Sequence, residues 1–179
     1  MGNALPHAQF GEHHARVVDA DPDRVWSALH EVRWGDLRLT RPLMAVRLGW
    51  RRTAGAPRMV DAGPGAPIHR DPPRTMSSGL VGQPWHAVPR MGPAMASLDD
   101  LRDFDEPGWL KFGMEWTLSP LAGGRTLVET VTLCAATDEH SRRRFSAYWT
   151  LIRPFSGLIR RELLGVVARA VSEEPGRSG

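Results

Sequence analysis

A single long amphipathic segment, residues 138–173, constrains this chain more than any other feature. At about 100° per residue, six apolar side chains fall within about 40° of Ile152 on a helical projection: Phe145, Tyr148, Ile159, Leu163, Val166 and Ala170. A helix with such a stripe must bury it against another layer of structure. Because a hairpin precedes the segment, we expect that layer to be a twisted antiparallel sheet, with a hollow between the two where small molecules bind.

Two strands joined by a glycine turn lead directly into this helix. Residues 109–118 alternate in polarity, which places five apolar side chains on one strand face: Leu110, Phe112, Met114, Trp116 and Leu118. The turn at residues 120–124 ends in two glycines and introduces a second strand over residues 125–134. We expect the more apolar face of this second strand to point inward, and that face holds Leu127, Glu129, Val131 and Leu133.

The long helix also carries signals at its start and in its middle. Thr137 or Asp138 is expected to cap its first turn. Pro154 removes the helical hydrogen bond to the carbonyl of Thr150, which predicts a kink or a split. Because the apolar stripe keeps its phase across the proline, we predict one bent helix rather than two separate helices.

The N-terminal part of the chain predicts a strand followed by two short helices. Ala15 and Val17 alternate with polar neighbours in a strand over residues 12–18. The sequence Asp21-Pro22-Asp23 is typical of a helix start, with an aspartate cap and a proline in the first turn. A second helix is predicted from residue 42 through residue 48.

The middle of the chain is less regular. Residues 51–73 are rich in glycine and proline, so loops and edge strands are the structures that fit there. A strand is predicted over residues 76–85, and residues 86–107 read as a second loop-rich stretch with a solvated acidic surface.

Length and composition favour one domain inside the cell. The 179 residues divide into a flexible N-terminus (1–10), one domain (11–173) and a disordered tail (174–179). The pI of 9.9 overstates the basic character, because the formal net charge is only +3 and arginines are interspersed with acids. We therefore expect no nucleic-acid partner. The single cysteine excludes an internal disulfide and, without a signal peptide or membrane span, indicates a cytoplasmic protein.

The order of these elements resembles the helix-grip fold of the START/SRPBCC superfamily, which includes the birch-pollen allergen and polyketide cyclase/dehydrase proteins. Residues 14–25, 79–85 and 123–130 carry the resemblance, and so do residues 145–163 (FSAYWTLIRPFSGLIRREL), which look like the C-terminal helix of an uncharacterised bacterial branch. The resemblance implies an α+β fold in which a curved antiparallel sheet wraps around the helix. It also implies a cavity for lipids, sterols, polyketides or hormones, in which some members catalyse cyclisation. Residues 51–74 depart from this pattern.

Sequence motifs of catalysis are absent. The chain has no phosphate-binding glycine loop, no nucleophile elbow and no zinc-binding His-Glu-x-x-His. His13 and His14 are adjacent, so in a strand they point to opposite faces and cannot chelate one metal ion. We therefore expect neither a metal nor a cofactor.

Three polar residues are the candidates for catalysis at the expected cavity. Glu129, if it points inward, would have a raised pKa and could act as a general acid or base, and so could His86. Arg153 lies with Ser156 and Arg160 at the flank of the stripe, where an arginine could bind a carboxylate, enolate or phenolate through two hydrogen bonds. A structural salt bridge is the alternative interpretation for Glu129 and for these arginines.

The candidate ligand-binding residues are apolar or aromatic, except for one serine. Core packing is the alternative interpretation for the aromatic ones. The set comprises Trp85, Met114, Trp116, Phe145, Tyr148, Trp149, Ile152, Ser156 and Ile159.

Three functions fit this sequence. The first is binding of a hydrophobic, cyclic or polyketide-like small molecule between sheet and helix. The second is a cofactor-independent cyclase, aromatase or lyase that acts in the same cavity, with Glu129 or His86 moving protons and Arg153 stabilising an enolate. The third is a protein-interaction module with an apolar surface. The sequence leaves the oligomeric state open.

Overall fold

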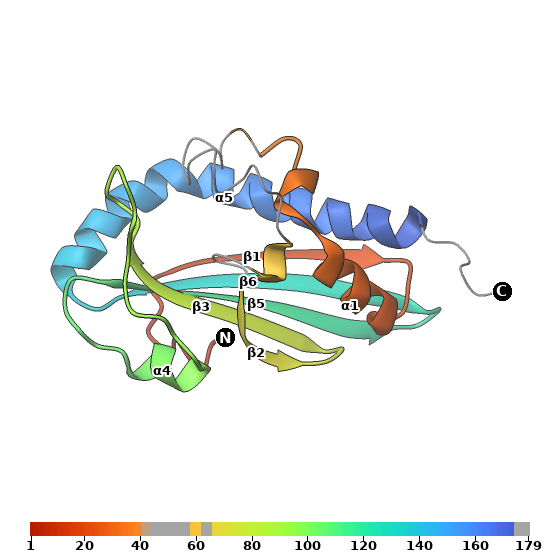
Figure 1. Cartoon of the computed structure of the whole chain (residues 1–179), viewed down its shortest axis with the longest axis horizontal. Helices are drawn as coiled ribbons and strands as arrows, with labels where there is room; N and C mark the ends of the chain where they lie inside the picture. The colour runs from red at the N-terminus through yellow and green to blue at the C-terminus, as the bar shows by residue number, and fades with distance from the viewer. Residues whose placement is uncertain (41, 43–57, 62–65, 174–179) are drawn as a thin grey trace.

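The computed structural model describes residues 1–40, 42, 58–61 and 66–173. One long helix crosses one face of an antiparallel sheet (Figure 1). The elements are β1 (Phe10–Val18), α1 (Pro22–Glu31), η1 (Trp34–Asp36), η2 (Met59–Asp61), β2 (Pro67–Asp71), β3 (Thr75–Gln83), β4 (Arg90–Met91), α4 (Leu98–Asp103), β5 (Leu110–Leu121), β6 (Arg125–Ala136) and α5 (Glu139–Glu173). The predicted α+β fold class, a curved sheet around a long C-terminal helix, is confirmed.

Some sequence-based predictions fall on residues that the structure does not describe. Nearly all of the second short helix, at residues 42–48, lies outside the described residues, and so do parts of residues 51–74 and the whole C-terminal tail. Among the described residues, none of the helices is both long enough and apolar enough to cross a membrane.

The sheet is organised around the hairpin of β5 and β6. Its strand order is β1-β6-β5-β3-β2, and the short β4 pairs with β3. The hairpin register runs from Leu110 opposite Ala136 to Leu121 opposite Arg125. Gly123 and Gly124 form the turn with φ angles of +77° and +67°, a backbone conformation that glycine adopts without strain. The predicted glycine-turn hairpin is therefore present.

The inner face of the sheet, toward α5, agrees with the prediction for β5 but not for β6. The apolar set of β5 from Leu110 to Leu118 faces α5, as expected. On β6 the inward residues are Val128, Thr130 and Thr132, with Cys134 beyond them. The expected inward orientation of Glu129 is therefore wrong, because strand neighbours point to opposite faces. The outer face is partly apolar because other parts of the chain pack against it.

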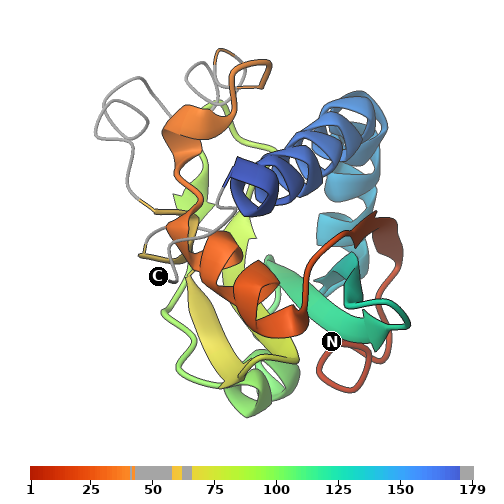
Figure 2. The same cartoon turned by 90° about the vertical axis from the view of Figure 1, so that its right-hand side faces the viewer.

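The outer face is covered by the N-terminal residues and α4, on the side of the sheet away from α5 (Figures 1 and 2). Met1, Leu5 and Leu101 pack there with Val81 of β3 and with Leu133 of β6. Burial on the outer face explains why β6 carries apolar residues on both sides.

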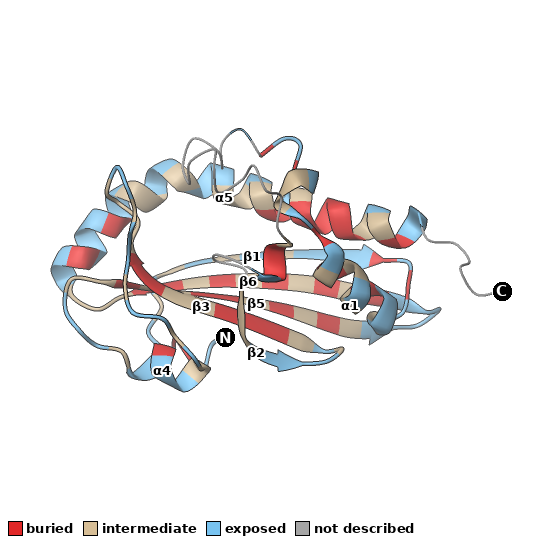
Figure 3. Cartoon of the chain, in the orientation of Figure 1, coloured by how far each residue is buried: buried red, intermediate tan, exposed pale blue. Residues whose placement is uncertain are grey.

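Helix α5 is anchored to the rest of the chain near its two ends. Phe145 packs with Leu110 and Cys134 near the N-terminal end. Leu163 to Val167 pack with α1 and with Val128 near the other end. Between Phe145 and Arg160 no residue of α5 is buried, and Figure 3 shows the buried residues gathered toward the two ends. The middle of the helix is therefore held less tightly than its ends.

The helix continues through Pro154 as one element and arches over the sheet (Figure 1). This agrees with the predicted single bent helix. Beyond the proline, Glu162 fixes the chain that follows α1: its carboxylate accepts hydrogen bonds from the backbone N–H of Leu39 at 2.7 Å and of Thr40 at 2.9 Å. A segment from the first half of the chain is thereby tied to α5.

Asp138 caps α5, and its removal is expected to destabilise the fold. Its carboxylate accepts hydrogen bonds from the backbone N–H of Ser141 at 2.8 Å and of Gly108. We expect Asp138→Ala to lower the free energy of unfolding in urea by about 1–2 kcal/mol. Asp138→Asn keeps an acceptor and should lose less. Equal losses in the two variants would contradict the capping role.

The same cap should depend on pH. Hydrogen bonds from the backbone of Ser141 and of Gly108 hold the pKa of Asp138 below its ordinary value. Its contribution is therefore complete at neutral pH and is lost as the pH falls through this lowered pKa. Asp138→Ala should lose less stability than the unaltered protein on acidification over that interval, as measured by urea unfolding at each pH.

Candidate functional site

A row of polar side chains lies on the inner face of the sheet, beneath α5. His14 of β1 pairs in register with Thr130 of β6, which pairs with Trp116 of β5. The Nε2 atom of His14, Oγ1 of Thr130 and Nε1 of Trp116 are buried and have no hydrogen-bond partner among the described residues. Buried polar atoms in proteins are nearly always paired. Three such atoms on neighbouring strands mark this row as a place where a polar group can be bound.

Arg160 adds a buried positive charge next to this row. Only 8% of its surface is exposed. Its Nε donates a hydrogen bond to Oγ1 of Thr132 at 3.3 Å, although a guanidinium has five N–H donors. Burial lowers the pKa of Arg160 to about 10, while Glu12 and Cys134 nearby act in the opposite direction. The side chain is therefore a cation at neutral pH.

Glu12 supplies the corresponding negative charge from β1. Its side chain is 7% exposed, and its Oε2 accepts a hydrogen bond from the Ser156 hydroxyl at 2.8 Å. No carboxylate oxygen of the described residues lies within 4.0 Å of the Arg160 guanidinium. The two charges thus attract each other without direct contact.

His14 is neutral in this environment. Its Nε2 lies 3.8 Å from Oε2 of Glu12, which is too long for a hydrogen bond. Burial lowers the pKa of His14 below its ordinary value, and the negative charge of Glu12 only partly opposes this effect. A neutral imidazole at neutral pH can accept or donate one proton at Nε2.

Apolar side chains adjoin the polar row and remain partly exposed. Leu80 and Phe112 are paired on the inner face of the sheet. Ile152 and Ile159 belong to the stripe of α5 that faces them, and all four side chains are only half-buried. The described residues therefore do not fully cover these four apolar side chains, which lie beside buried polar groups.

The predicted catalytic residues do not lie in this arrangement. Glu129 is on the outer face of the sheet, where it pairs with Nε2 of His13 at 3.0 Å. Arg153 is exposed on α5. His86 is half-buried beside Trp85, with their ring centroids 6.2 Å apart, and burial together with the charges of Arg90 and Arg144 lowers its pKa. Catalytic roles for these residues stay predictions.

The predicted ligand-binding residues separate into two groups. Met114, Trp116 and Ile159 belong to the core near α1 and the C-terminal half of α5. The aromatic residues gather at the other end of the sheet, around the edge-to-face contact of Phe10 with Phe145 at 4.8 Å. This second group comprises Trp85, Phe145, Tyr148 and Trp149. Ile152 and Ser156 lie on α5 between the two groups, as half-buried residues.

Six residues of the site were not among the predicted ones: the polar residues Glu12, His14, Thr130 and Thr132, and the apolar residues Leu80 and Phe112. The signal that could identify the first two is Phe10, which is in phase with them on β1 and packs on Phe145. Ala15 and Val17 are apolar but lie on the outer face of β1, whereas its inner face is polar. A rule that places apolar residues inward therefore selects the wrong face of this strand. For β6 the faces are similar in polarity, so the pattern alone cannot select one.

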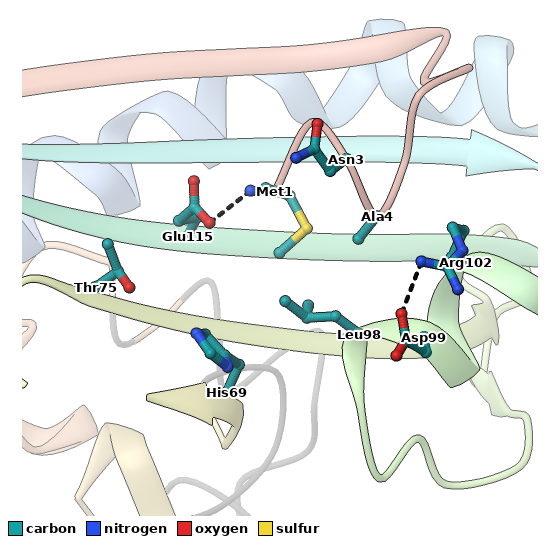
Figure 4. A pocket seen from close by; sticks show the side chains of 9 residues that line it. All are labelled: Met1, Asn3, Ala4, His69, Thr75, Leu98, Asp99, Arg102 and Glu115. Atoms are coloured by element: carbon teal, nitrogen blue, oxygen red, sulfur yellow. Dashed lines mark hydrogen bonds and ion pairs between the residues drawn. The ribbon is translucent and has the colours of Figure 1, made fainter. Parts of the chain in front are cut away.

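A pocket of about 290 Å³ also lies on the outer face of the sheet (Figure 4). Its lining includes Met1, His69 and Thr75. The charged groups within it are paired with each other, since the Met1 amino group contacts Glu115 and Arg102 contacts Asp99 at 2.7 Å. The described residues contain no group of three or more His, Cys, Asp or Glu arranged to hold a metal ion.

Comparisons with known proteins bear on the fold only. No protein-family model matches the sequence, and no curated protein matches it. Similar solved structures include a protein from Mesorhizobium loti, at 13% identity over 93% of this chain and 100% of that chain, with a TM-score of 0.40. CalU16 from Micromonospora echinospora shares 14% identity over 91% and 84% of the two chains (TM-score 0.32). The Zhui aromatase/cyclase from Streptomyces shares 15% identity over 95% and 98% (TM-score 0.35).

A double-mutant cycle should reveal the attraction between Glu12 and Arg160. We expect Glu12→Gln and Arg160→Met each to lower the free energy of unfolding in urea, because each leaves the other charge buried alone. The double variant should lose less than the sum, with a coupling of about 0.5–3 kcal/mol.

The outer-face pair of His13 and Glu129 provides the matched control for this cycle. The His13 side chain is 56% exposed, so His13→Gln and Glu129→Gln should couple more weakly. Additive losses for Glu12 and Arg160 would show that the two charges do not interact.

Proposed function

We propose that this chain binds a hydrophobic small molecule between the inner face of the sheet and the middle of α5. The observation that carries the proposal is the set of inward-facing apolar side chains that stay half-exposed, Leu80 and Phe112 on the sheet and Ile152 on the helix. Burying such surface under a ligand is favourable by roughly 25 cal/mol per Å². A cyclic or polyketide-like molecule has apolar surface that would cover these side chains.

The composition of the surroundings supports a small molecule over a macromolecule. Ligand sites are mostly apolar with a few polar groups that fix orientation. Here the polar groups are few and buried: Arg160 is 8% exposed, and Nε2 of His14 and Nε1 of Trp116 have almost no accessible surface. A few buried polar groups beside apolar side chains are the composition of a small-molecule site.

The test compares two neighbouring residues of α5 that point in different directions. Ile152 is half-buried toward the sheet, whereas Leu151 is 69% exposed on the other side. We expect Ile152→Arg to weaken binding of the neutral dye Nile red at least about tenfold, or about 1.4 kcal/mol. Leu151→Arg should change it less than about twofold, because its side chain stays in solvent.

Fluorescence titration of the dye measures both effects. The reverse pattern, with loss on Leu151→Arg alone, would place the dye on the exposed stripe of Leu151, Phe155 and Leu158. That result would contradict the proposed site and favour the interaction-module function.

A second candidate function is cofactor-independent cyclisation in the same place. The observation that favours it is the half-buried imidazole of His14, whose lowered pKa favours the neutral form, beside the Glu12 carboxylate. Such a pair is suited to removing a proton from a carbon next to a carbonyl. In this function the resulting enolate carbon attacks a second carbonyl of the same molecule, and the proton returns to the new alkoxide. Arg160 would stabilise the enolate oxygen.

The cyclase function predicts a separation of binding from turnover. With a linear poly-β-ketone thioester as substrate, His14→Gln should lower kcat by about 100-fold or more while the affinity for Nile red stays unchanged. Product formation followed by absorbance measures the first quantity. Equal turnover by the unaltered protein and His14→Gln would eliminate His14 as the base.

A further inference from the structure

We infer that the molecule bound under α5 carries an acidic oxygen group, a carboxylate or an equivalent delocalised oxygen anion, and that Arg160 holds it. This inference rests on the proposed binding function and adds the chemical class of the ligand. It is carried by a guanidinium that is 8% exposed and makes one hydrogen bond within the described part of the chain, at 3.3 Å to Thr132. Buried arginines are ordinarily paired with an acid.

The donors left on Arg160 suit an oxygen anion. The bond to Thr132 uses Nε, so the two terminal nitrogens retain four N–H groups in a planar fork. Such a fork matches the two oxygens of a carboxylate. A neutral carbonyl would use one or two of these donors and leave the charge without a counterion.

Neighbouring buried groups add to the polar character of this part of the sheet. Oγ1 of Thr130 and Nε1 of Trp116 are buried without a partner in the described part of the chain, and both can donate a hydrogen bond. Thr130 and Thr132 lie on the same face of β6, two residues apart, which is the spacing of adjacent side chains on one face. Two uncharged donors and one cation therefore gather on this part of the sheet.

The negative charge of Glu12 weakens the attraction between Arg160 and a bound anion. Glu12 is nevertheless not the direct partner of the guanidinium. Its carboxylate accepts from Ser156 at 2.8 Å and stays beyond 4.0 Å from the guanidinium. Its negative charge opposes a second anion nearby, so the preference for an acid over a neutral analogue should be moderate rather than extreme.

The experiment compares two probes that differ only in charge, 2-naphthoic acid and 2-naphthamide. By isothermal titration calorimetry at neutral pH, the unaltered protein should bind the acid about tenfold more tightly than the amide. In Arg160→Gln this ratio should fall below about twofold while the amide still binds measurably through its apolar ring, which also shows that the variant is folded.

Arg161→Gln is the matched control, because it removes the same charge from an exposed side chain at the next position. Its ratio should stay within about twofold of the original, since solvent and salt screen an exposed charge. Arg160→Lys provides the second variant if Arg160→Gln does not fold. It keeps a charge without the planar fork, so the ratio should drop several-fold.

The outcomes distinguish failure of the anion inference from failure of the proposed binding function. If the amide and Nile red bind and the acid binds no more tightly, the anion inference is overturned and the proposed function stands. An acid preference that survives both Arg160 variants also overturns it, because another group must then hold the anion. If none of the three probes binds, the proposed function itself fails, and the anion inference with it.

Discussion

The attachment of α5 to the sheet near both ends is the constraint on which the rest of the structure depends. Phe145 is fixed against Phe10 and Leu110, and Leu163 to Val167 are fixed in the core with α1. A helix of 35 residues extends about 50 Å at 1.5 Å per residue. With its ends held, the central turns need few buried side chains of their own, and Pro154 removes one backbone hydrogen bond within them. The half-buried side chains in the middle of α5 follow from this geometry.

The buried charges under the helix are difficult to explain by stability alone. Taking Arg160 and Glu12 out of water is costly, and ion pairs in protein interiors are often no more stabilising than well-packed apolar residues. Here the two charges are not even in contact, so little of that cost is recovered. Departures from good packing of this kind are expected at functional sites. The arrangement is therefore an observation in favour of the proposed binding site, since packing of the core does not require it.

The sequence predicts the fold well and the site only in part. Periodicity identifies β5 and α5, because each has one strongly apolar face or stripe. The glycine turn identifies β6 as the strand that completes the hairpin with β5. The same logic fails for β1 and the faces of β6. Glu12, His14, Thr130 and Thr132 make the inner face polar, while Leu133 is apolar and packs outward under the N-terminal residues. A rule that places apolar residues inward must misplace a polar site such as this one, and Glu129 is misplaced with it.

The order of residues across the sheet also sets the direction in which a ligand would lie. The polar groups Glu12, His14, Thr130 and Thr132 belong to β1 and β6, at one edge. The half-exposed Phe112 and Leu80 belong to β5 and β3, the next strands across. A molecule with an acidic end at Arg160 would thus place its apolar body over β5 and β3, perpendicular to the strands. Because the two ends of such a molecule meet different chemistry, the sheet itself can discriminate between orientations, and the helix has only to cover the molecule.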